Sequence, residues 1–245
     1  SRPMSGFSAL AVEGIPELHE GDDLAAHILE RIELEDGDIV VVAQKAISKI
    51  EGRVVRLDSY EPSDRAREIA GGEDPRRIEA ILQEARSVIR VRPPLVICET
   101  RHGFICASAG VDGSNAPEAD MLVLLPLDPD ASAAKLHETL RERSGKDVGV
   151  IVTDSFGRPW RQGTIDVAIG AAGVEVLRSH IGERDPVGYE LHATVIAVAD
   201  EVASAAQLVT GKFGRVPVTI VRGLDLRGDG RATDIAIPPE RDLFR

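Results

Sequence analysis

An apolar run that turns abruptly polar constrains the fold of this chain more than any other stretch. Residues 148–152 form an apolar run, which predicts a buried strand, and Thr153, Asp154 and Ser155 follow it directly. In α/β-type sheets, ligands gather outside the ends of strands. We therefore expect the strand to end at this polar triplet and to carry a carboxylate and a hydroxyl into a binding loop.

Two arginines and two turn-forming residues lie in the same expected loop. Gly157 and Pro159 break the strand pattern, and Arg158 and Arg161 add positive charge. A carboxylate, a hydroxyl and guanidinium groups together suit a divalent metal and an anionic, phosphorylated ligand. The alternative is a plain strand-to-loop turn, with an Asx-type hydrogen bond and solvated arginines.

Strand and helix patterns alternate along the chain, which predicts a mixed α/β (α+β) fold with mixed sheets and packed helices. Further strands are expected at residues 7–12, 39–43, 53–57, 95–98, 104–107, 166–173 and 217–221. Helices are expected from Asp22 or Asp23 to Gly37, twice within residues 63–90 from starts at Ser63 and Asp74, at 128–144, and at 190–209. The chain of 245 residues is long enough for one domain over residues 4–245, or for two closely associated subdomains.

Two of these expected elements carry a further prediction. The alanine-rich helix at 190–209 allows close packing, so we expect a dimer interface there. Cys98 and Cys106 flank an expected hairpin turn at 101–103, and their spacing matches no zinc or redox signature. Both cysteines are therefore expected to be reduced and half-buried. The residues after 221 are expected to be irregular.

A second polar loop is expected at residues 109–118, AGVDGSNAPE. Its two glycines, its proline and its short polar residues exclude a regular element, although both flanks have strand patterns. Asp112 and Asn115 are its candidate functional residues. Asp and Asn are also common in turns that carry no chemistry, which is the alternative here.

Charge and composition exclude several classes of partner. The net charge of −12 opposes binding to nucleic acid or to anionic lipid, and eight aromatic residues are too few for a base-stacking platform. No apolar run approaches the ~20 residues that span a bilayer, and no leader pattern follows Ser1, Arg2 and Pro3, which precede Met4. We expect a cytoplasmic protein without a membrane or nucleic-acid partner.

The familiar catalytic and nucleotide motifs are missing. The sequence has no G-x-x-x-x-G-K-[ST], no G-x-G-x-x-G, no H-E-x-x-H and no G-x-S-x-G, and its six histidines are scattered. The candidates that remain are oxygen ligands and cations: Asp112, Asp154, Ser155, Lys45, Lys49, Arg158 and Arg161. Oxygen ligands favour magnesium or manganese over zinc, and a divalent metal with lysine is suited to a nucleotide's phosphates.

Several long blocks resemble one family. They are GIPELHEGDD (14–23), DGDIVVVAQKAISKIEGR (36–53), AGVDGSN (109–115), LLPLDPDASA (124–133), VIVTDSFGRPWRQG (150–163), IGERDPVGYEL (181–191) and VADEVASAA (198–206). In order and over nearly the whole chain, they are similar to the coenzyme F420:L-glutamate ligase family. The resemblance implies an unusual ligase fold, a homodimer with the nucleotide near the subunit interface, and the γ-linked addition of L-glutamate to the deazaflavin coenzyme precursor. It also implies GTP as co-substrate, with magnesium or manganese and room for a monovalent cation.

The resemblance assigns roles to individual residues. Asp112 and Asp154 match the family's metal ligands, and Ser155 stands where many members have a metal-ligating threonine. The nucleotide contacts that it implies are Ile15, Pro16, Glu17, Leu18, Gln44, Lys49, Asn115, Gly211 and Lys212. Arg158 or Arg161 is the candidate group for a substrate carboxylate, with solvated loop arginines as the alternative.

Two positions depart from the family pattern. Gln44 replaces a small hydroxyl residue, so its nucleotide contact is lost or made differently. Lys212 lies where archaeal members have an acidic ligand of a second metal, and a protonated lysine cannot ligate a metal. The second metal is then held by fewer groups, or Lys212 supplies the positive charge itself.

The reaction that the resemblance implies passes through an acyl phosphate, made when the precursor carboxylate attacks the γ-phosphoryl group of GTP. Two other classes stay open: a metal-dependent nucleotide or phosphoester hydrolase, and a non-catalytic deazaflavin- or nucleotide-binding protein. Some bacterial members carry a C-terminal flavin reductase domain, and no such domain is expected within these 245 residues.

Overall fold

A five-stranded mixed sheet forms the centre of the molecule. The computed structural model describes residues 6–114, 116–210 and 216–243. The strand order is β1 (Ser8–Ala11), β12 (Val218–Arg222), β2 (Ile39–Ala43), β8 (Gly149–Arg158) and β9 (Arg161–Ala172). Only β2 and β8 pair in parallel, and the other neighbours are antiparallel. The mixed α/β class expected from the sequence is confirmed.

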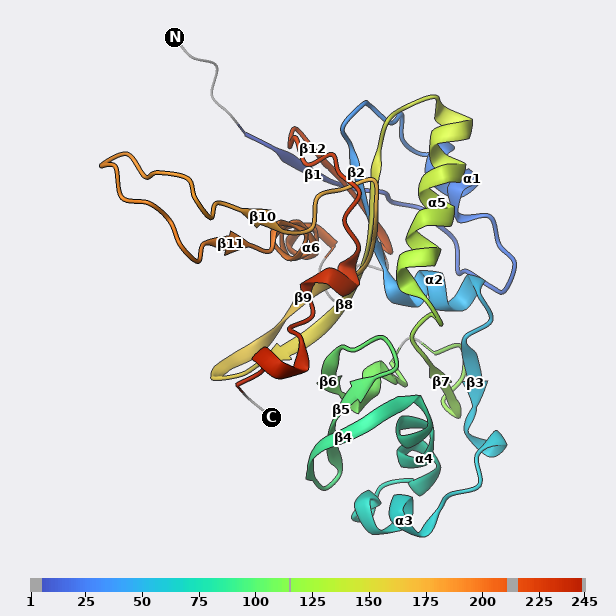
Figure 1. The fold of residues 1–245 in the computed structure, drawn as a ribbon. Helices are drawn as coiled ribbons and strands as arrows, with labels where there is room; N and C mark the ends of the chain where they lie inside the picture. The colour runs from blue at the N-terminus through green and yellow to red at the C-terminus, as the bar shows by residue number, and fades with distance from the viewer. Residues whose placement is uncertain (1–5, 115, 211–215, 244–245) are drawn as a thin grey trace.

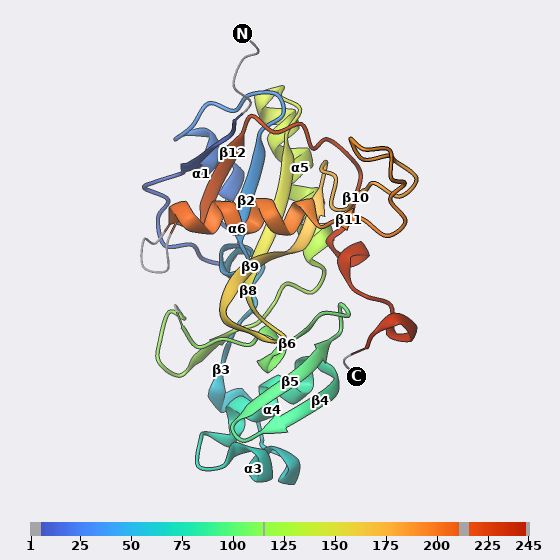
Figure 2. The same cartoon turned by 90° about the vertical axis from the view of Figure 1, so that its left-hand side faces the viewer.

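Helices cover both faces of this sheet (Figures 1 and 2). Helices α1 (Leu24–Leu29) and α5 (Pro129–Ser144) pack on one face, and α6 (Val198–Thr210) crosses the other. The β-branched run of β2 shows why this arrangement forms. Val40 and Val42 belong to the core under α1 and α5, whereas Ile39 and Val41 belong to the core under α6. Because successive side chains of a strand point to opposite faces, a continuous apolar run suits a strand that is buried on both.

A second group of elements has a core of its own, below the main sheet in Figure 1. It contains α3 (Asp64–Ala70), α4 (Pro75–Glu84) and the antiparallel strands β4 (Ala85–Arg92), β5 (Leu95–Thr100) and β6 (Ile105–Ala107). The strand pair β3 (Val54–Arg56) and β7 (Met121–Val123) connects it to the main body, and α2 (Gln44–Ile50) follows β2 directly. The division into domains itself stays a prediction.

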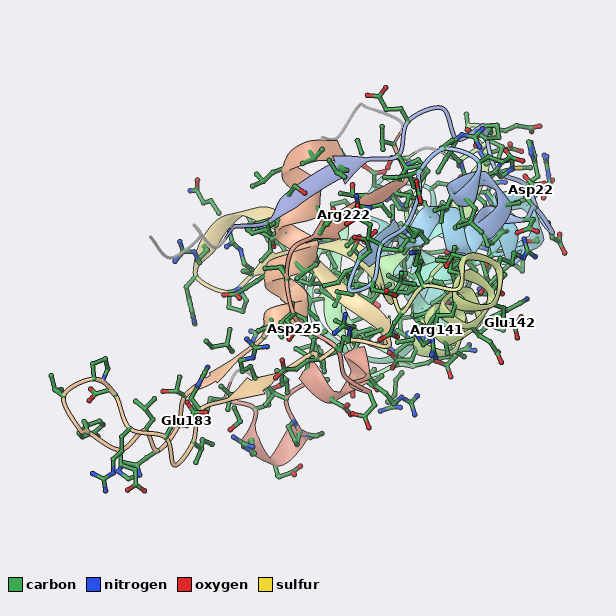
Figure 3. All side chains as sticks on the ribbon, turned by 90° about the horizontal axis from the view of Figure 1, so that it is seen from above. Asp22, Arg141, Glu142, Glu183, Arg222 and Asp225 are labelled. Atoms are coloured by element: carbon green, nitrogen blue, oxygen red, sulfur yellow. The ribbon has the colours of Figure 1, made fainter. Side chains whose placement is uncertain are left out.

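An arm extends from the sheet between β9 and α6. Its base is the two-stranded ladder of β10 (Arg178–Ser179) with β11 (Val195–Ile196), and the residues between these strands project away from the body (Figure 1). Glu183 lies on this arm, far from Arg141 and Glu142 of α5 (Figure 3). No helix in the described part of the chain is long and apolar enough to cross a membrane.

Asp130, in the first turn of α5, fastens the C-terminal segment to the sheet. Its carboxylate is buried and accepts hydrogen bonds from the backbone N–H groups of Ala171 and Ala232, at 2.9 and 2.8 Å. The hydroxyl of Thr233 donates a third bond at 2.9 Å. The segment after β12, expected to be irregular, contains two short 3-10 turns at Ala232–Ile235 and Pro239–Arg241.

Helix ends and β-branched runs are where the sequence predictions are confirmed. Strand β2 has the predicted bounds, and α5 begins after Asp128, whose carboxylate accepts from the N–H of Ala131 at 3.0 Å. Gly145 ends α5 with a φ of 70°, a conformation that glycine adopts at little cost. Ser63 and Asp74 cap α3 and α4 as expected.

Five predicted boundaries are wrong by several residues. Strand β8 does not end at Thr153 but continues to Arg158, and β9 begins at Arg161 rather than at 166, because the two strands pair as far as the turn between them. Residues 85–90 are strand rather than helix, because β4 pairs with β5. The first helix ends at Leu29 rather than near Gly37, and the last begins at Val198 rather than at 190.

The cysteines are a smaller correction. Both are free, as expected, and they face each other across the β5–β6 ladder. Both are buried rather than half-buried, because the second core closes over Cys98 and neighbouring side chains cover Cys106. Burial raises the pKa of the Cys106 thiol to about 12.

Candidate functional site

Asp154 lies where β8 runs past the end of its parallel neighbour. Thr153 is paired with Ala43, the last residue of β2, and the chain of β2 then enters α2. Asp154 is therefore the first residue of β8 beyond the covered part of the sheet. Strand alternation places it on the face of Val152 and Phe156, both of which contact the core under α1 and α5.

The environment of Asp154 disfavours its negative charge. Burial raises the pKa of this carboxyl to about 7, and the nearby charges of Asp166 and Asp112 act in the same direction. The backbone N–H of Ser155 and the ammonium group of Lys45 oppose the rise. A pKa of about 7 leaves this carboxyl half-ionised at neutral pH. A cation bound beside it would favour the ionised form and so lower the pKa again.

Asp112 is held by a lysine and a serine in the loop expected from the sequence. Its Oδ2 lies 2.7 Å from the Nζ of Lys45 and accepts from the hydroxyl of Ser114 at 2.7 Å, while its Oδ1 accepts from the backbone N–H of Ser114 at 2.7 Å. Burial acts to raise the pKa of Asp112, but the bonds from Lys45 and Ser114 outweigh it and the pKa is lowered. Lys45 also donates to the Ser114 hydroxyl at 2.7 Å.

Asp112, Asp154 and Lys45 suit a divalent cation whose coordination is completed by water and a bound phosphate ligand. Among the residues that the structure describes, no group of three or more His, Cys, Asp or Glu side chains is placed to hold a metal. Mg²⁺ commonly binds through one or two carboxylates and takes its remaining ligands from water and substrate phosphates. Asp112 and Asp154 supply that number of carboxylates, and the ammonium group of Lys45 lies where positive charge is needed.

Ser155 lies on the opposite face of the strand from Asp154. Its hydroxyl donates to Oδ1 of Asp166 at 2.6 Å, and the side chain of Gln207 on α6 donates to the same oxygen at 2.7 Å. Burial raises the pKa of Asp166. The structure thus does not bring Ser155 together with Asp112 and Asp154, and metal binding by Ser155 stays a prediction.

Asp166 and Gln207 are polar groups that the sequence did not single out. Asp166 is the cross-strand partner of Ser155, so its contact with Ser155 can be predicted only once the register of β8 and β9 is known. The sequence offers only the aspartate at the start of an expected strand, which is a weak signal.

The predicted nucleotide residues 15–18 lie beside α2. Ile15 and Leu18 are buried in the main core, whereas Pro16 and Glu17 are exposed. Glu17 forms an ion pair with Lys49 in the last turn of α2. The side chains of Ile15 and Leu18 therefore serve packing, and only the backbone, Pro16 and Glu17 are accessible to a ligand.

Gln44, the first residue of α2, has a donor without an acceptor. It is 2% exposed, and its side-chain oxygen accepts from the hydroxyl of Ser48 at 2.8 Å. Its amide nitrogen Nε2 has no hydrogen-bond partner among the described residues. A buried donor without a partner is costly, so an incoming acceptor would be stabilised here. Asn115, Gly211 and Lys212 lie outside the described residues.

Arg158 and Arg161 lie at the tip of the β8–β9 hairpin, away from Asp154 along the strand. They are paired directly across the ladder, and Nη2 of Arg158 donates to the carbonyl of Gln162 at 3.2 Å. Between them are Pro159 and Trp160, a two-residue turn.

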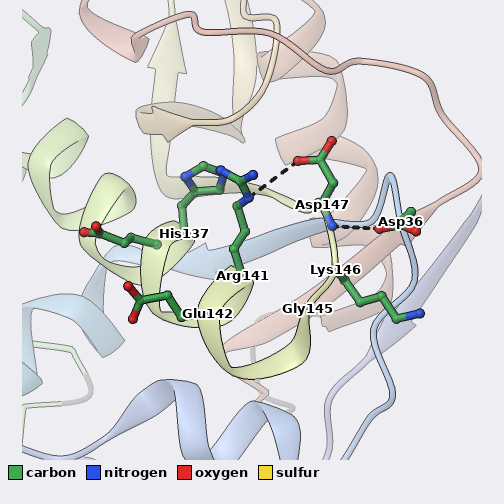
Figure 4. Close-up of a pocket in the computed structure, with 8 residues that line it drawn as sticks. Asp36, His137, Arg141, Glu142, Gly145, Lys146 and Asp147 are labelled. Atoms are coloured by element: carbon green, nitrogen blue, oxygen red, sulfur yellow. Dashed lines mark hydrogen bonds and ion pairs between the residues drawn. The ribbon is translucent and has the colours of Figure 1, made fainter.

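The surface hollow in Figure 4 lies elsewhere, at the C-terminal end of α5. It measures about 650 Å³, and acids and bases mix in its lining, with Arg141 and Asp147 at 3.7 Å. None of the predicted site residues lines it. We therefore place the candidate site at Asp112, Asp154 and Lys45, where charge and desolvation converge, rather than in this hollow.

Comparisons with known proteins identify one family. A model of the F420-0:Gamma-glutamyl ligase family matches residues 14–223. The coenzyme F420:L-glutamate ligase of Methanopyrus kandleri is 47% identical over 253 residues, covering 99% of this chain and 100% of the relative. The ligases of the same name from Methanothermobacter thermautotrophicus and Haloarcula marismortui are 43% and 44% identical. These alignments cover 98% of this chain in both cases, and 99% and 96% of the relatives.

Proposed function

Because this chain belongs to the F420-0:gamma-glutamyl ligase family, we propose that it uses GTP and a divalent metal to add L-glutamate, in γ linkage, to the deazaflavin precursor F420-0. The observation that carries the chemical part is the arrangement of Asp112, Lys45 and Asp154. Lys45 pairs with Asp112, and its charge also acts on Asp154, a carboxyl with a raised pKa on the exposed continuation of a buried strand. This charge pattern suits the binding of metal and phosphate together.

The reaction requires activation, because a carboxylate does not react usefully with an amine at neutral pH. An oxygen of the precursor's terminal carboxylate attacks the γ-phosphorus of GTP and GDP leaves, which yields an acyl phosphate. The nitrogen of glutamate then attacks the acyl carbon, the carbon–oxygen bond to phosphate breaks, and the amine loses a proton as the amide forms. A metal ion would neutralise the phosphates as charge moves onto the leaving group.

The residues of this chain supply positioning and charge. Asp112 and Asp154 would hold magnesium or manganese, and Lys45 would move from Asp112 toward the phosphates when the metal takes its place. Lys49 would assist at the phosphates after leaving Glu17. The amide nitrogen of Gln44, which has no acceptor among the residues that the structure describes, would offer a further contact to the nucleotide. Preorganisation of this kind supplies on the order of 7–11 kcal/mol in well-oriented reactions.

A mass-spectrometric assay tests the proposal. F420-0, L-glutamate, GTP and manganese are incubated with the protein, and each component is omitted in turn. A product heavier by one or more glutamyl units, dependent on both GTP and metal, is expected. Consumption of GTP without glutamylated product would instead identify a nucleotide hydrolase, and binding without any turnover would identify a binding protein.

A homodimer is also part of the proposal. Helix α6 exposes Leu208 and Val209 near its C-terminal end, and β1 is an edge strand of the main sheet. Exposed apolar side chains and open strand edges are the features that subunit contacts cover. Analytical ultracentrifugation is expected to show twice the mass of the 26.3 kDa chain, and a 26.3 kDa species at micromolar concentration would contradict the dimer.

A further inference from the structure

The tip of the β8–β9 hairpin places a tryptophan where the backbone favours glycine. Strand β8 ends at Arg158 and β9 begins at Arg161, so Pro159 and Trp160 form the turn. Trp160 has a φ of 63°, in the left-handed region. After a proline in a tight turn, glycine or asparagine is the residue that adopts this conformation with least strain. The local sequence therefore conflicts with the local structure at Trp160.

Two more features of the same four residues are unfavourable for stability. The side chain of Trp160 is 86% exposed, although tryptophan normally buries most of its surface. Arg158 and Arg161 are direct cross-strand partners, and like charges in that position repel each other. The Nε of Arg158 is buried and has no hydrogen-bond partner among the described residues. Strain and exposure that cluster in this way are typical of a binding element.

The location of the tip relative to Asp154 narrows the choice of ligand. Six residues of extended chain separate Asp154 from Trp160, which corresponds to roughly 20 Å. Helix α2, which carries Lys49 at its far end, leads away from the end of β2 in a different direction, to the right in Figure 1, while the hairpin points to the lower left. Lys49, a predicted phosphate contact, and the hairpin tip thus lie on elements that leave the sheet in different directions.

We propose that the face of Trp160 stacks on the planar deazaflavin ring of the precursor, while Arg158 and Arg161 pair with anionic groups of the chain attached to that ring. An exposed indole in a turn that two cross-strand arginines close matches a ligand that is both planar and negatively charged. With its ring at the tip, the precursor extends its carboxylate back along the hairpin toward Asp154. This inference rests on the proposed function, and it adds that the hairpin tip is the part of the site that binds the deazaflavin precursor.

Fluorescence gives a direct test, since Trp160 is the sole tryptophan of the chain. Titration of the full-length protein with F420-0, in the absence of GTP, is expected to quench the tryptophan emission with saturation. GTP with manganese is expected to leave the emission unchanged. Quenching by GTP instead of F420-0 would overturn the proposal and assign the indole to guanine.

Kinetics of three variants supply the second test. Trp160→Ala is expected to raise the KM for F420-0 roughly 5- to 100-fold, the range for loss of one stacking contact, with the KM for GTP within about twofold of wild type. Trp160→Gly is expected to have the same kinetic effect without lowering Tm, because glycine suits the φ of 63°. Tyr189→Ala, which removes an exposed aromatic residue from the arm, is the matched control and is expected to leave the KM for F420-0 unchanged.

Two outcomes would overturn the inference while leaving the proposed function intact. The first is an active Trp160→Ala ligase with an unchanged KM for F420-0. The second is a Trp160→Ala protein that becomes monomeric in ultracentrifugation, which would assign the indole to a subunit contact. Failure of the wild-type protein to glutamylate F420-0 would instead remove the proposed function, and the fluorescence titration would then decide separately whether the tip binds the ring.

Discussion

The inner and outer halves of the β8–β9 hairpin share one hydrogen-bonded ladder but differ in how far their side chains are buried. In the inner half, Val150, Ile151 and Val152 are fully buried between α5 and α6. In the outer half, from Asp154 to the turn at Trp160, every side chain is partly or fully exposed. Backbone hydrogen bonds continue through both halves, so the ladder holds the outer half in place, and Phe156 and Val167 pack against the edge of the main core there. Side chains released from packing can then carry charge and bind ligands.

An irregularity in the ladder separates the halves. The register of β8 against β9 shifts between Val152 and Thr153, since Val152 faces Gly170 and Thr153 faces Ala168. Bulges of this kind bend a strand and redirect its side chains, and they occur next to active sites. In this hairpin the extra residue is Ile169 of β9, so β9 bends at the end of the buried half while β8 keeps its alternation through Asp154.

The largest expected effect comes from removing the charge that begins the outer half. Asp154→Ala is expected to lower kcat/KM at least about a thousandfold, since a group that positions charge in the transition state is lost. Circular dichroism and Tm of the variant are expected to match those of wild type. Asp225→Ala, which removes an exposed carboxylate elsewhere, is the control. An Asp154→Ala protein with a tenth of wild-type activity would remove the metal role.

A pair of glycine substitutions compares the halves directly. A Cβ at Gly170, in the inner half, would lie 2.2 Å from the carbonyl oxygen of Pro129, whereas a Cβ at Gly157, in the outer half, would meet nothing within 4 Å. Gly170→Ala is expected to cost about 2–4 kcal/mol of unfolding free energy, because the backbone must shift. Gly157→Ala is expected to be neutral or to stabilise by up to about 1 kcal/mol. Urea unfolding of both variants measures the difference, and equal losses would contradict the distinction between the halves.

The pH dependence of stability is expected to be smaller and to depend on metal. Burial raises the pKa of Asp154 from 3.8 to about 7, so the folded protein binds this proton more tightly than the unfolded chain. The resulting stabilisation is fully present below a pH of about 4 and is lost as the pH rises through about 7. In EDTA, Asp154→Asn is therefore expected to match wild type in Tm at pH 4 and to exceed it by roughly 2–8 °C at pH 8.

The control for this pH effect is metal. Manganese binds ionised carboxylates, so saturating manganese at pH 8 is expected to raise the Tm of wild type and to reverse its order with Asp154→Asn. If the difference in Tm between wild type and Asp154→Asn in EDTA is the same at pH 4 and pH 8, the carboxyl of Asp154 is not desolvated.

The smallest effect concerns the opposed arginines of the tip. Arg161→Gln removes one of two facing positive charges and is expected to stabilise the protein by about 0.2–0.5 kcal/mol at low salt. At about 1 M salt the difference is expected to vanish, because the screening length falls to about 3 Å. Arg92→Gln, where the cross-strand partner is Leu95, is the control without an opposing cation. A salt-independent difference would contradict the electrostatic cause.

The parts of the fold that the sequence predicted well are those set by nearby residues. Asp128, Pro129 and Gly145 mark both ends of α5 through local capping, and the β-branched run of β2 needs no partner to be recognised. The failures are elements that form only with a distant partner. Residues 85–92 have no regular alternation and follow a helix directly, and pairing with β5 decides that they form a strand.

The same division applies to the candidate site. Asp112 and Asp154 are predictions from loop and strand context; in the structure Lys45 pairs with Asp112, and both groups act on Asp154 through their charge, while the metal role of the two aspartates stays a prediction. The partnership of Ser155 with Asp166 and Gln207 was not predicted, because it depends on the register of β9 and on the position of α6. The exposure and positive φ of Trp160 likewise follow from where β8 turns, which the sequence placed several residues too early.

The hydrogen bonds to Asp130 have a consequence for synthesis on the ribosome. The carboxylate is buried beneath a segment that is made about a hundred residues later, since Ala232 and Thr233 supply its later donors. Until that segment emerges, only the N–H of Ala171 is available to it from the sheet. Until then water can solvate the carboxylate, so its burial and this fastening of the C-terminal segment to the sheet are completed only when translation is nearly finished.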